Sequence, residues 1–80
     1  MFYVYILKSL KDEGYYFGHT ANLQERLKRH NSGKVTSTKN RRPFVIHHHE
    51  LFQTKSEAFQ RELFFKSFEG RKWLYSNNII

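Results

Sequence analysis

Residues suited to binding an anion occur on a helix face where apolar residues are expected. In the segment LQERLKRHN, residues 23–31, Leu23, Leu27 and His30 follow the i, i+4, i+7 spacing of an inward-facing stripe. Arg26 lies at the edge of this stripe, one turn before His30. Two groups that can be cationic repel each other at this spacing unless an anion is near. The structural alternatives are an Arg26 side chain that snorkels to solvent and a hydrogen-bonded core histidine.

A carboxylate occupies the corresponding place in a second helical segment. Glu62 shares a helix face with Ala58 and Phe65. A carboxylate on an apolar face costs several kcal/mol unless it is paired or binds a metal. Lys66, at i+4, or an arginine across the core could pair with it. Otherwise one carboxylate together with substrate phosphates is a usual way to hold Mg²⁺.

Two tyrosines in aromatic strand segments could bring phenols to the same place. Alternation in YYFG puts Tyr16 and Gly18 on one strand face and Tyr15 and Phe17 on the other. We expect the sheet face under both helices to carry Tyr5 and Tyr16, so that the phenols converge with Arg26, His30 and Glu62 on one basic cleft. Gly18, which has no side chain, is expected to let a substrate backbone approach.

The triplet HHH at residues 47–49 is a weaker candidate for a metal site. In a regular strand His47 and His49 point together and His48 points away. A zinc site needs further ligands, and the chain has no cysteine. We therefore interpret the triplet as strand surface.

These residues need a small mixed framework to position them. Hydrophobic periodicity and capping signals predict a strand, a strand, a helix, a strand and a helix, followed by a break at Gly70 and a further short helix. The predicted ranges are 2–7, 15–18, 22–31, 44–52, 55–68 and 71–76. We predict an α+β fold over residues 1–80 as a single domain, with a small three-stranded antiparallel sheet flanked by α-helices.

Charge and composition indicate a polyanionic partner. The chain has 14 Lys and Arg against 7 Asp and Glu, a net charge of +7, which favours nucleic acid. The basic residues that we assign to DNA binding are Lys28, Arg29, Lys34, Lys39, Arg41 and Arg42. The longest apolar run has six residues, and no signal peptide is recognised, so we expect a cytoplasmic protein with no membrane association.

The ordered motifs resemble the GIY-YIG nucleases, and most closely small stand-alone bacterial members related to the N-terminal catalytic domain of the excision-repair excinuclease. The name-giving tripeptides would be YVY, residues 3–5, and YFG, residues 16–18. LQERLKRHN resembles the family's helix, and TKSEAFQRE its metal-binding segment. The resemblance covers nearly the whole chain. His19 stands where the family often has Lys or Tyr, so no catalytic step is assigned to it.

The resemblance implies hydrolysis of DNA phosphodiesters, with repair of DNA as one setting. Glu62 would hold one Mg²⁺ or Mn²⁺. Tyr5 would deprotonate or orient the attacking water with Tyr16 beside it, and Tyr16 is the alternative base. Arg26 would neutralise charge on the phosphorane, and His30 would hold a phosphate oxygen or tune Tyr5.

Two other classes of function are kept as alternatives. One is a non-catalytic nucleic-acid-binding module that retained the fold, and the other is a protein-interaction domain whose basic face meets an acidic partner. The sequence leaves the preferred DNA structure and the action on RNA open. A homodimer or a repair-protein partner is a further expectation, and apolar residues Phe59, Leu63 and Phe64 on the second helix offer a dimer face.

Overall fold

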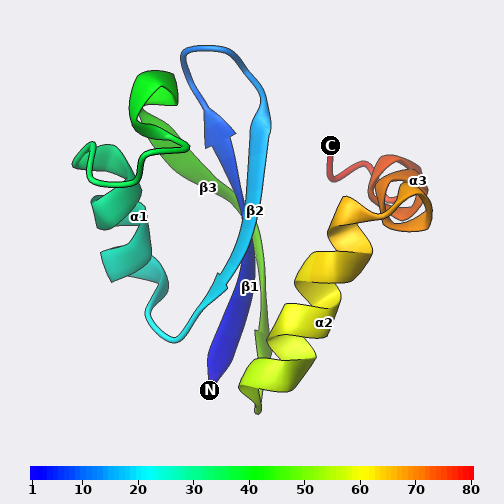
Figure 1. The fold of residues 1–80 in the computed structure, drawn as a ribbon. Helices are drawn as coiled ribbons and strands as arrows, with labels where there is room; N and C mark the ends of the chain where they lie inside the picture. The colour runs from blue at the N-terminus through cyan, green and yellow to red at the C-terminus, as the bar shows by residue number, and fades with distance from the viewer.

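The computed structural model describes residues 1–80 and confirms the α+β class. A three-stranded antiparallel sheet lies between helices, as Figure 1 shows. None of the helices is long and apolar enough to cross a membrane. The elements in chain order are β1 (Phe2–Ser9), β2 (Tyr15–Thr20), α1 (Leu23–Asn31), the 3₁₀ turn η1 (Lys39–Arg41), β3 (Phe44–Phe52), α2 (Lys55–Lys66) and α3 (Phe68–Ser76).

The sheet places β1 at its centre, in the order β2-β1-β3. The four residues Val4 to Leu7 of β1 are all buried, since helices cover both faces. In Figure 1, α1 lies on one side of the sheet and α2 and α3 lie on the other. Tyr5, Leu7, Leu23 and Phe44 form the core beneath α1. Val4, Ile6, Phe17, Phe65 and Leu74 form the core beneath α2 and α3.

The helices α1 and α2 begin at the caps that the sequence predicts. The Asn22 side chain accepts a hydrogen bond from the Glu25 backbone N–H at 3.1 Å. Thr54 and Glu57 form a reciprocal capping box at the start of α2. The buried faces also agree with the sequence pattern, because α1 buries Leu23 and His30. In α2 the buried residues are Ala58, Glu62 and Phe65.

The predicted break at Gly70 is wrong, because the chain turns at Ser67. Ser67 ends α2, and its side chain accepts a hydrogen bond from the Gly70 backbone N–H at 3.0 Å to begin α3. Gly70 lies inside the first turn of α3. A Cβ atom there would lie 1.6 Å from the Phe64 carbonyl oxygen, so the glycine permits close contact between the two helices.

A β-bulge changes the orientation of the histidine triplet from the predicted one. Leu7 pairs with Ile46 and the adjacent Ile6 pairs with His48, so His47 is an extra residue in β3. His48 consequently pairs with Glu50 on the α2 side at 2.9 Å, whereas His49 contacts the ring of Tyr3 on the α1 side. His47 contacts the Tyr15 ring and the Ile79 carbonyl. The expectation that His47 and His49 point together was wrong because a regular two-residue period was assumed.

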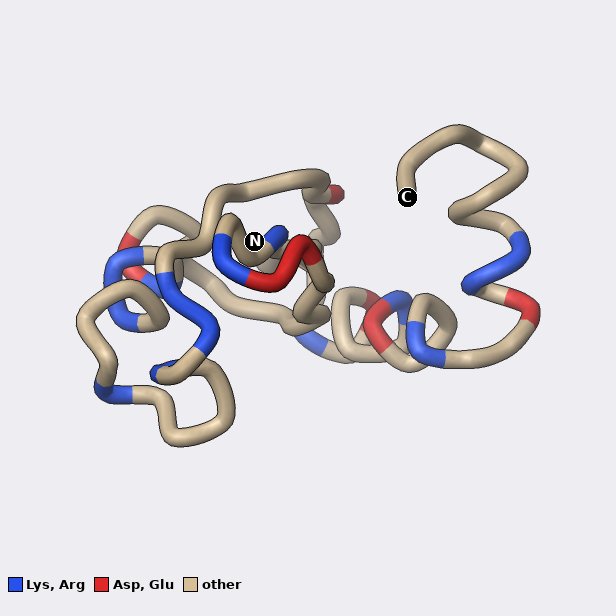
Figure 2. The backbone as a smooth tube through the Cα atoms, turned by 90° about the horizontal axis from the view of Figure 1, so that it is seen from above, with Lys and Arg blue, Asp and Glu red and all other residues tan.

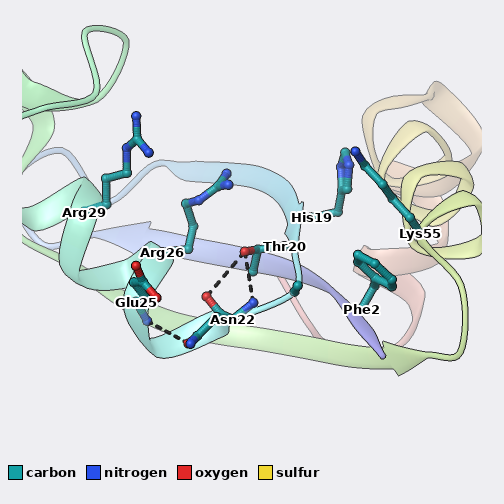
Figure 3. Close-up of a pocket in the computed structure, with 9 residues that line it drawn as sticks. Phe2, His19, Thr20, Asn22, Glu25, Arg26, Arg29 and Lys55 are labelled. Atoms are coloured by element: carbon teal, nitrogen blue, oxygen red, sulfur yellow. Dashed lines mark hydrogen bonds between the residues drawn. The ribbon is translucent and has the colours of Figure 1, made fainter.

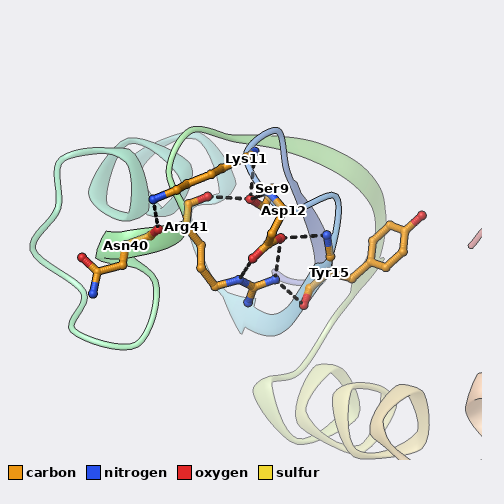
Figure 4. Close-up of polar contacts among 7 residues, drawn as sticks. Ser9, Lys11, Asp12, Tyr15, Asn40 and Arg41 are labelled. Carbon is orange, nitrogen blue, oxygen red and sulfur yellow. Dashed lines mark hydrogen bonds and ion pairs between the residues drawn. The ribbon is translucent and has the colours of Figure 1, made fainter.

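The basic loop between α1 and β3 is fixed to the turn between β1 and β2. Figure 4 shows Arg41 turned toward Asp12, with Nε at 2.7 Å from the carboxylate. Ser9 donates from Oγ to the Arg41 carbonyl at 2.6 Å, and Lys11 donates to the Asn40 carbonyl at 2.9 Å. These contacts hold the end of the loop against the sheet beside α1.

Candidate active site

A buried hydrogen-bonded chain connects β1, α1 and the basic loop. The Tyr5 hydroxyl lies 3.2 Å from His30 Nε2, and His30 Nδ1 lies 2.9 Å from Thr38 Oγ1. Tyr5 and His30 are each 1% exposed, and Thr38 is fully buried. Each of these three polar side chains thus has a hydrogen-bond partner, although all of them are buried away from water. His30 is the hydrogen-bonded core histidine considered above, and it also links two candidate functional residues.

Tyr5 is poorly placed to act as a base. Burial raises its pKa to about 12, although the neighbouring Arg26 opposes this shift. A phenol that is sealed from solvent and resists ionisation does not readily take a proton from water. Tyr16 is half-buried, and its ring centroid lies 4.9 Å from that of His30. Tyr16, the alternative left open by the sequence, is therefore the more solvent-accessible of the two phenols.

Gly18 accommodates Tyr5 and not a substrate backbone. Tyr5 pairs with Gly18 across the two strands. A Cβ atom at Gly18 would lie 2.4 Å from the Tyr5 hydroxyl oxygen, so any larger residue would displace the phenol. The expected close approach exists, but a side chain of the same molecule occupies the space.

Burial keeps His30 neutral near pH 7. Its pKa is lowered from 6.5 by removal from water and by the nearby charges of Arg26 and Arg29. The ring also contacts Phe44. A neutral imidazole can accept a hydrogen bond at one nitrogen while it donates at the other, as the chain from Tyr5 to Thr38 requires.

Glu62 approaches from the other face of the sheet. The expectation that all five candidate residues lie under one face is wrong, because α2 covers the face opposite to α1. The Glu62 carboxylate lies 2.7 Å from His19 Nδ1 and 2.6 Å from Lys66 Nζ. Its charge still contributes to raising the Tyr5 pKa, so the two sides are electrostatically connected. The ion pair with Lys66 considered as a structural explanation is therefore present.

An open pocket of about 580 Å³ lies between α1 and the start of α2. Figure 3 shows Arg26 and Arg29 on one side and His19 and Lys55 on the other. His19 thus lines the pocket and also contacts Glu62. The pocket connects the two faces at the end of β2, where a phosphate could meet cations from both helices.

Several basic residues around the pocket and along α1 have no acidic partner. Arg26, Arg29 and Lys55 form no ion pair, and neither do Lys28 and Lys34, which line a second pocket along α1. Figure 2 shows Lys and Arg positions recurring along α1 and the loop after it. Arg41 is bound to Asp12, and Arg42 donates to the Lys39 carbonyl. Of the predicted DNA-binding residues, Lys28, Arg29, Lys34, Lys39 and Arg42 carry charges without an acidic partner.

Comparison with known proteins identifies the framework that carries these residues. Residues 1–76 match the family model of the GIY-YIG catalytic domain. The chain belongs to the GIY-YIG family. It is 45% identical over 73 residues to the UPF0213 protein SH2523 of Staphylococcus haemolyticus. The aligned region covers 90% of this chain and 88% of that protein. It is 42% identical over 71 residues to the UPF0213 protein YazA of Bacillus subtilis, covering 88% and 71% of the two chains.

A solved structure supports the same assignment. The solution NMR structure of the UPF0213 protein BH0048 from Bacillus halodurans is 38% identical, with a TM-score of 0.54. The match covers 95% of this chain and 84% of that one. The GIY-YIG family is one of nucleases that generally act on DNA with divalent metal ions, whereas the names of these relatives state no activity.

The chemistry of Glu62 fits a metal of this kind. Its oxygens are hard donors, and a single carboxylate completed by phosphates and waters suits Mg²⁺ or Mn²⁺. No group of three or more acidic or histidine residues is arranged to hold a metal ion by protein ligands alone. Lys66 occupies one Glu62 oxygen, but its side chain is 49% exposed and can turn into solvent. The chemistry of the Glu62 carboxylate is thus compatible with a divalent ion completed by non-protein ligands.

Sequence reasoning missed three residues that the structure places at this candidate site. His19 was assigned no step, yet it contacts Glu62 and lines the pocket. Thr38 and Lys55 were not singled out. Because a threonine in a polar loop and a lysine at a helix start are common on surfaces, only tertiary contacts distinguish these two. The position of His19 directly after the YFG motif was the one available signal.

Proposed function

We propose that the protein is a metal-dependent endonuclease that hydrolyses DNA phosphodiester bonds. The observation that carries the proposal is the pocket at the end of β2, where unpaired Arg26, Arg29 and Lys55 meet His19, the partner of Glu62. Cations without acidic partners favour a phosphodiester in this place. Membership of a nuclease family agrees with that substrate.

The proposed roles follow from position and exposure. The half-buried phenol of Tyr16 orients or deprotonates the attacking water, and the Arg26 guanidinium neutralises charge that develops on the phosphoryl oxygens. The water oxygen bonds to phosphorus and loses a proton to the Tyr16 oxygen or to solvent, one P–O bond of the strand breaks, and the leaving oxygen takes up a proton from solvent. His30 bonds to the Tyr5 hydroxyl and packs against the Tyr16 ring, so it would keep both phenols in place.

A bound Mg²⁺ or Mn²⁺ would supply charge for the phosphate oxygens and the leaving group. Glu62 would hold it, and His19 orients that carboxylate through its 2.7 Å contact. Lys28, Arg29, Lys34, Lys39 and Arg42 would bind backbone phosphates on either side of the scissile bond. Such contacts position the strand without reading its sequence.

The test is incubation of the full chain with nicked, branched and single-stranded DNAs in Mg²⁺, Mn²⁺ or chelator. We expect metal-dependent cleavage that is lost in Glu62→Gln. Glu69→Gln, a change at an exposed glutamate of α3, is the matched control and should cut normally. Circular dichroism spectra of both variants serve as the control for folding.

The alternative is a nucleic-acid-binding module without catalysis. The occupation of both Glu62 oxygens by His19 and Lys66 is the observation that favours it. If the wild-type chain binds DNA in a salt-sensitive way but cuts none of the substrates with either metal, the alternative is supported and the nuclease proposal fails.

A further inference from the structure

Thr38 belongs to none of the motifs identified in the sequence, yet its side chain contacts the candidate active site. It lies in the basic loop, directly before η1, and its side chain is fully buried. Its Oγ1 lies 2.9 Å from His30 Nδ1. A threonine on the surface of a loop can form its hydrogen bonds with water and does not need a buried side-chain partner. The contact instead connects the loop to the ring that bonds to Tyr5.

The direction of the hydrogen bonds follows from the available partners. The Tyr5 hydroxyl is buried, and the acceptor within reach of its proton is His30 Nε2 at 3.2 Å. A buried O–H group must donate. Nε2 therefore carries the lone pair, and in a neutral ring the proton then lies on Nδ1.

Thr38 is the acceptor that this arrangement needs. If Nδ1 carries the proton, it donates to Thr38 Oγ1, and the threonine hydroxyl turns its own proton toward the Val35 carbonyl, 3.4 Å away. No buried side-chain nitrogen or oxygen in the protein is then left without a partner. The other tautomer of His30 would leave the Tyr5 proton without an acceptor.

We propose that Thr38 is a positioning residue that fixes the Nδ1–H tautomer of His30 and thereby directs the Tyr5 hydroxyl proton toward His30. The lone pairs of the Tyr5 oxygen are then free to face Arg26, which lies close enough to lower the Tyr5 pKa. Thr38 touches no substrate in this role.

The same contact joins the candidate active site to the basic loop. Lys39 follows Thr38 directly, and Arg41 donates its backbone N–H to the Thr38 carbonyl at 2.9 Å. A loop that lost the Thr38 contact would release His30 and change the position of these cations together. The effect on turnover rests on the proposed nuclease function, whereas the tautomer does not.

Long-range ¹H–¹⁵N NMR spectra of the histidines at neutral pH read the tautomer without any substrate. In the wild-type chain we expect His30 Nδ1 to be protonated and Nε2 to be unprotonated. Thr38→Ser keeps the hydroxyl and should keep this pattern. Thr38→Val keeps the shape without an acceptor, so His30 should shift toward the Nε2–H form. Thr36→Val, at an exposed threonine of the same loop, is the matched control and should leave the spectrum unchanged.

The kinetic readout separates positioning from folding. We expect Thr38→Val to lower kcat by about tenfold or more with little change in KM, and Thr38→Ser to remain close to the wild type. A wild-type Nε2–H tautomer, or an unchanged His30 spectrum in Thr38→Val, would overturn the proposal. If Thr38→Val fails to fold, the wild-type and Thr38→Ser spectra still decide. If no DNA is cut at all, the nuclease function fails while the tautomer result stands.

Discussion

Arginines on the two faces of the sheet have different surroundings. On the α2 side, Arg61 bonds to Glu50 at 2.8 Å and lies 4.6 to 4.9 Å from the rings of Phe64, Phe65 and Trp73. On the α1 side, Arg26 and Arg29 face an open pocket with no acidic partner. Cations that are paired and stacked stabilise the fold, whereas unpaired cations beside a pocket remain available to a ligand. Substitutions on the two faces should therefore have different consequences.

The largest effect is expected from Tyr16, the phenol that is only half-buried. Tyr16→Phe removes one oxygen from a half-buried side chain, and we expect turnover to fall by about 10² to 10⁴. The melting temperature should change little. Steady-state cleavage assays and thermal melts of the same samples test both statements.

Tyr5→Phe is the matched comparison within the same network. It removes the bond to buried His30, so we expect a loss of stability of about 1 kcal/mol and a smaller loss of turnover than in Tyr16→Phe. A dead Tyr5→Phe beside a nearly normal Tyr16→Phe would restore Tyr5 as the base.

A large effect on stability alone is expected on the α2 face. Arg61→Met removes the bonds to Glu50 and the contacts with three rings, and it should lower the free energy of unfolding by about 1 to 3 kcal/mol. DNA affinity should stay close to that of the wild type. Arg71→Met, at an exposed arginine over a single ring, should cost less. Urea unfolding curves measure both, and equal stability of Arg61→Met and the wild type would contradict the structural role.

Substitutions of the cations beside the pocket should weaken DNA binding and leave stability unchanged. Arg29→Gln and Lys55→Gln should each reduce the slope of log affinity against log salt by about 1, because each removes one phosphate contact. Their melting temperatures should change little, since neither side chain has an acidic partner. Lys72→Gln on α3 makes the same charge change away from the pocket. A salt slope reduced equally by Lys72→Gln would show that net charge alone determines binding.

The smallest expected effect is a pH dependence of stability from His30. Because burial and the nearby arginines lower its pKa in the folded state, the unfolded chain binds more protons just below 6.5. His30 therefore destabilises the fold progressively as the pH falls below about 6.5, and has no such effect above it. Thermal melts from pH 7.5 to 5.5 should show a shallower decline in His30→Gln than in the wild type. Parallel declines would assign the pH dependence to other groups.

The local features of this protein were predictable from sequence, and the relations between distant segments were less so. The caps at Asn22 and Thr54 and the buried face of α2, with Glu62 between Ala58 and Phe65, follow from spacing of three to four residues. The family motifs also pointed to Tyr5, Tyr16 and Arg26. Whether α1 and α2 cover the same face depends on how the chain crosses the sheet, which periodicity within a helix does not determine.

The remaining errors have a common physical cause. Gly18 looked open because its partner, the Tyr5 ring, comes from another strand. The helix break was assigned to Gly70 because glycine is a strong local signal, whereas Ser67 acts through a cap that serves two helices. Thr38 and His19 gain their importance from contacts 8 and 43 residues away in the chain. Such contacts exist only after folding.

The extra residue at His47 also bears on how the molecule behaves at high concentration. β3 is an edge strand of nine residues, and an uninterrupted edge of that length is a template on which another copy can add a strand. The irregularity beside Ile46 divides this free edge into two short stretches with different twist, neither long enough to recruit a partner well. Deleting His47 would restore a continuous edge, and light scattering would then report concentration-dependent assembly. The residue that keeps His47 and His49 from pointing together thus also helps to keep the chains apart.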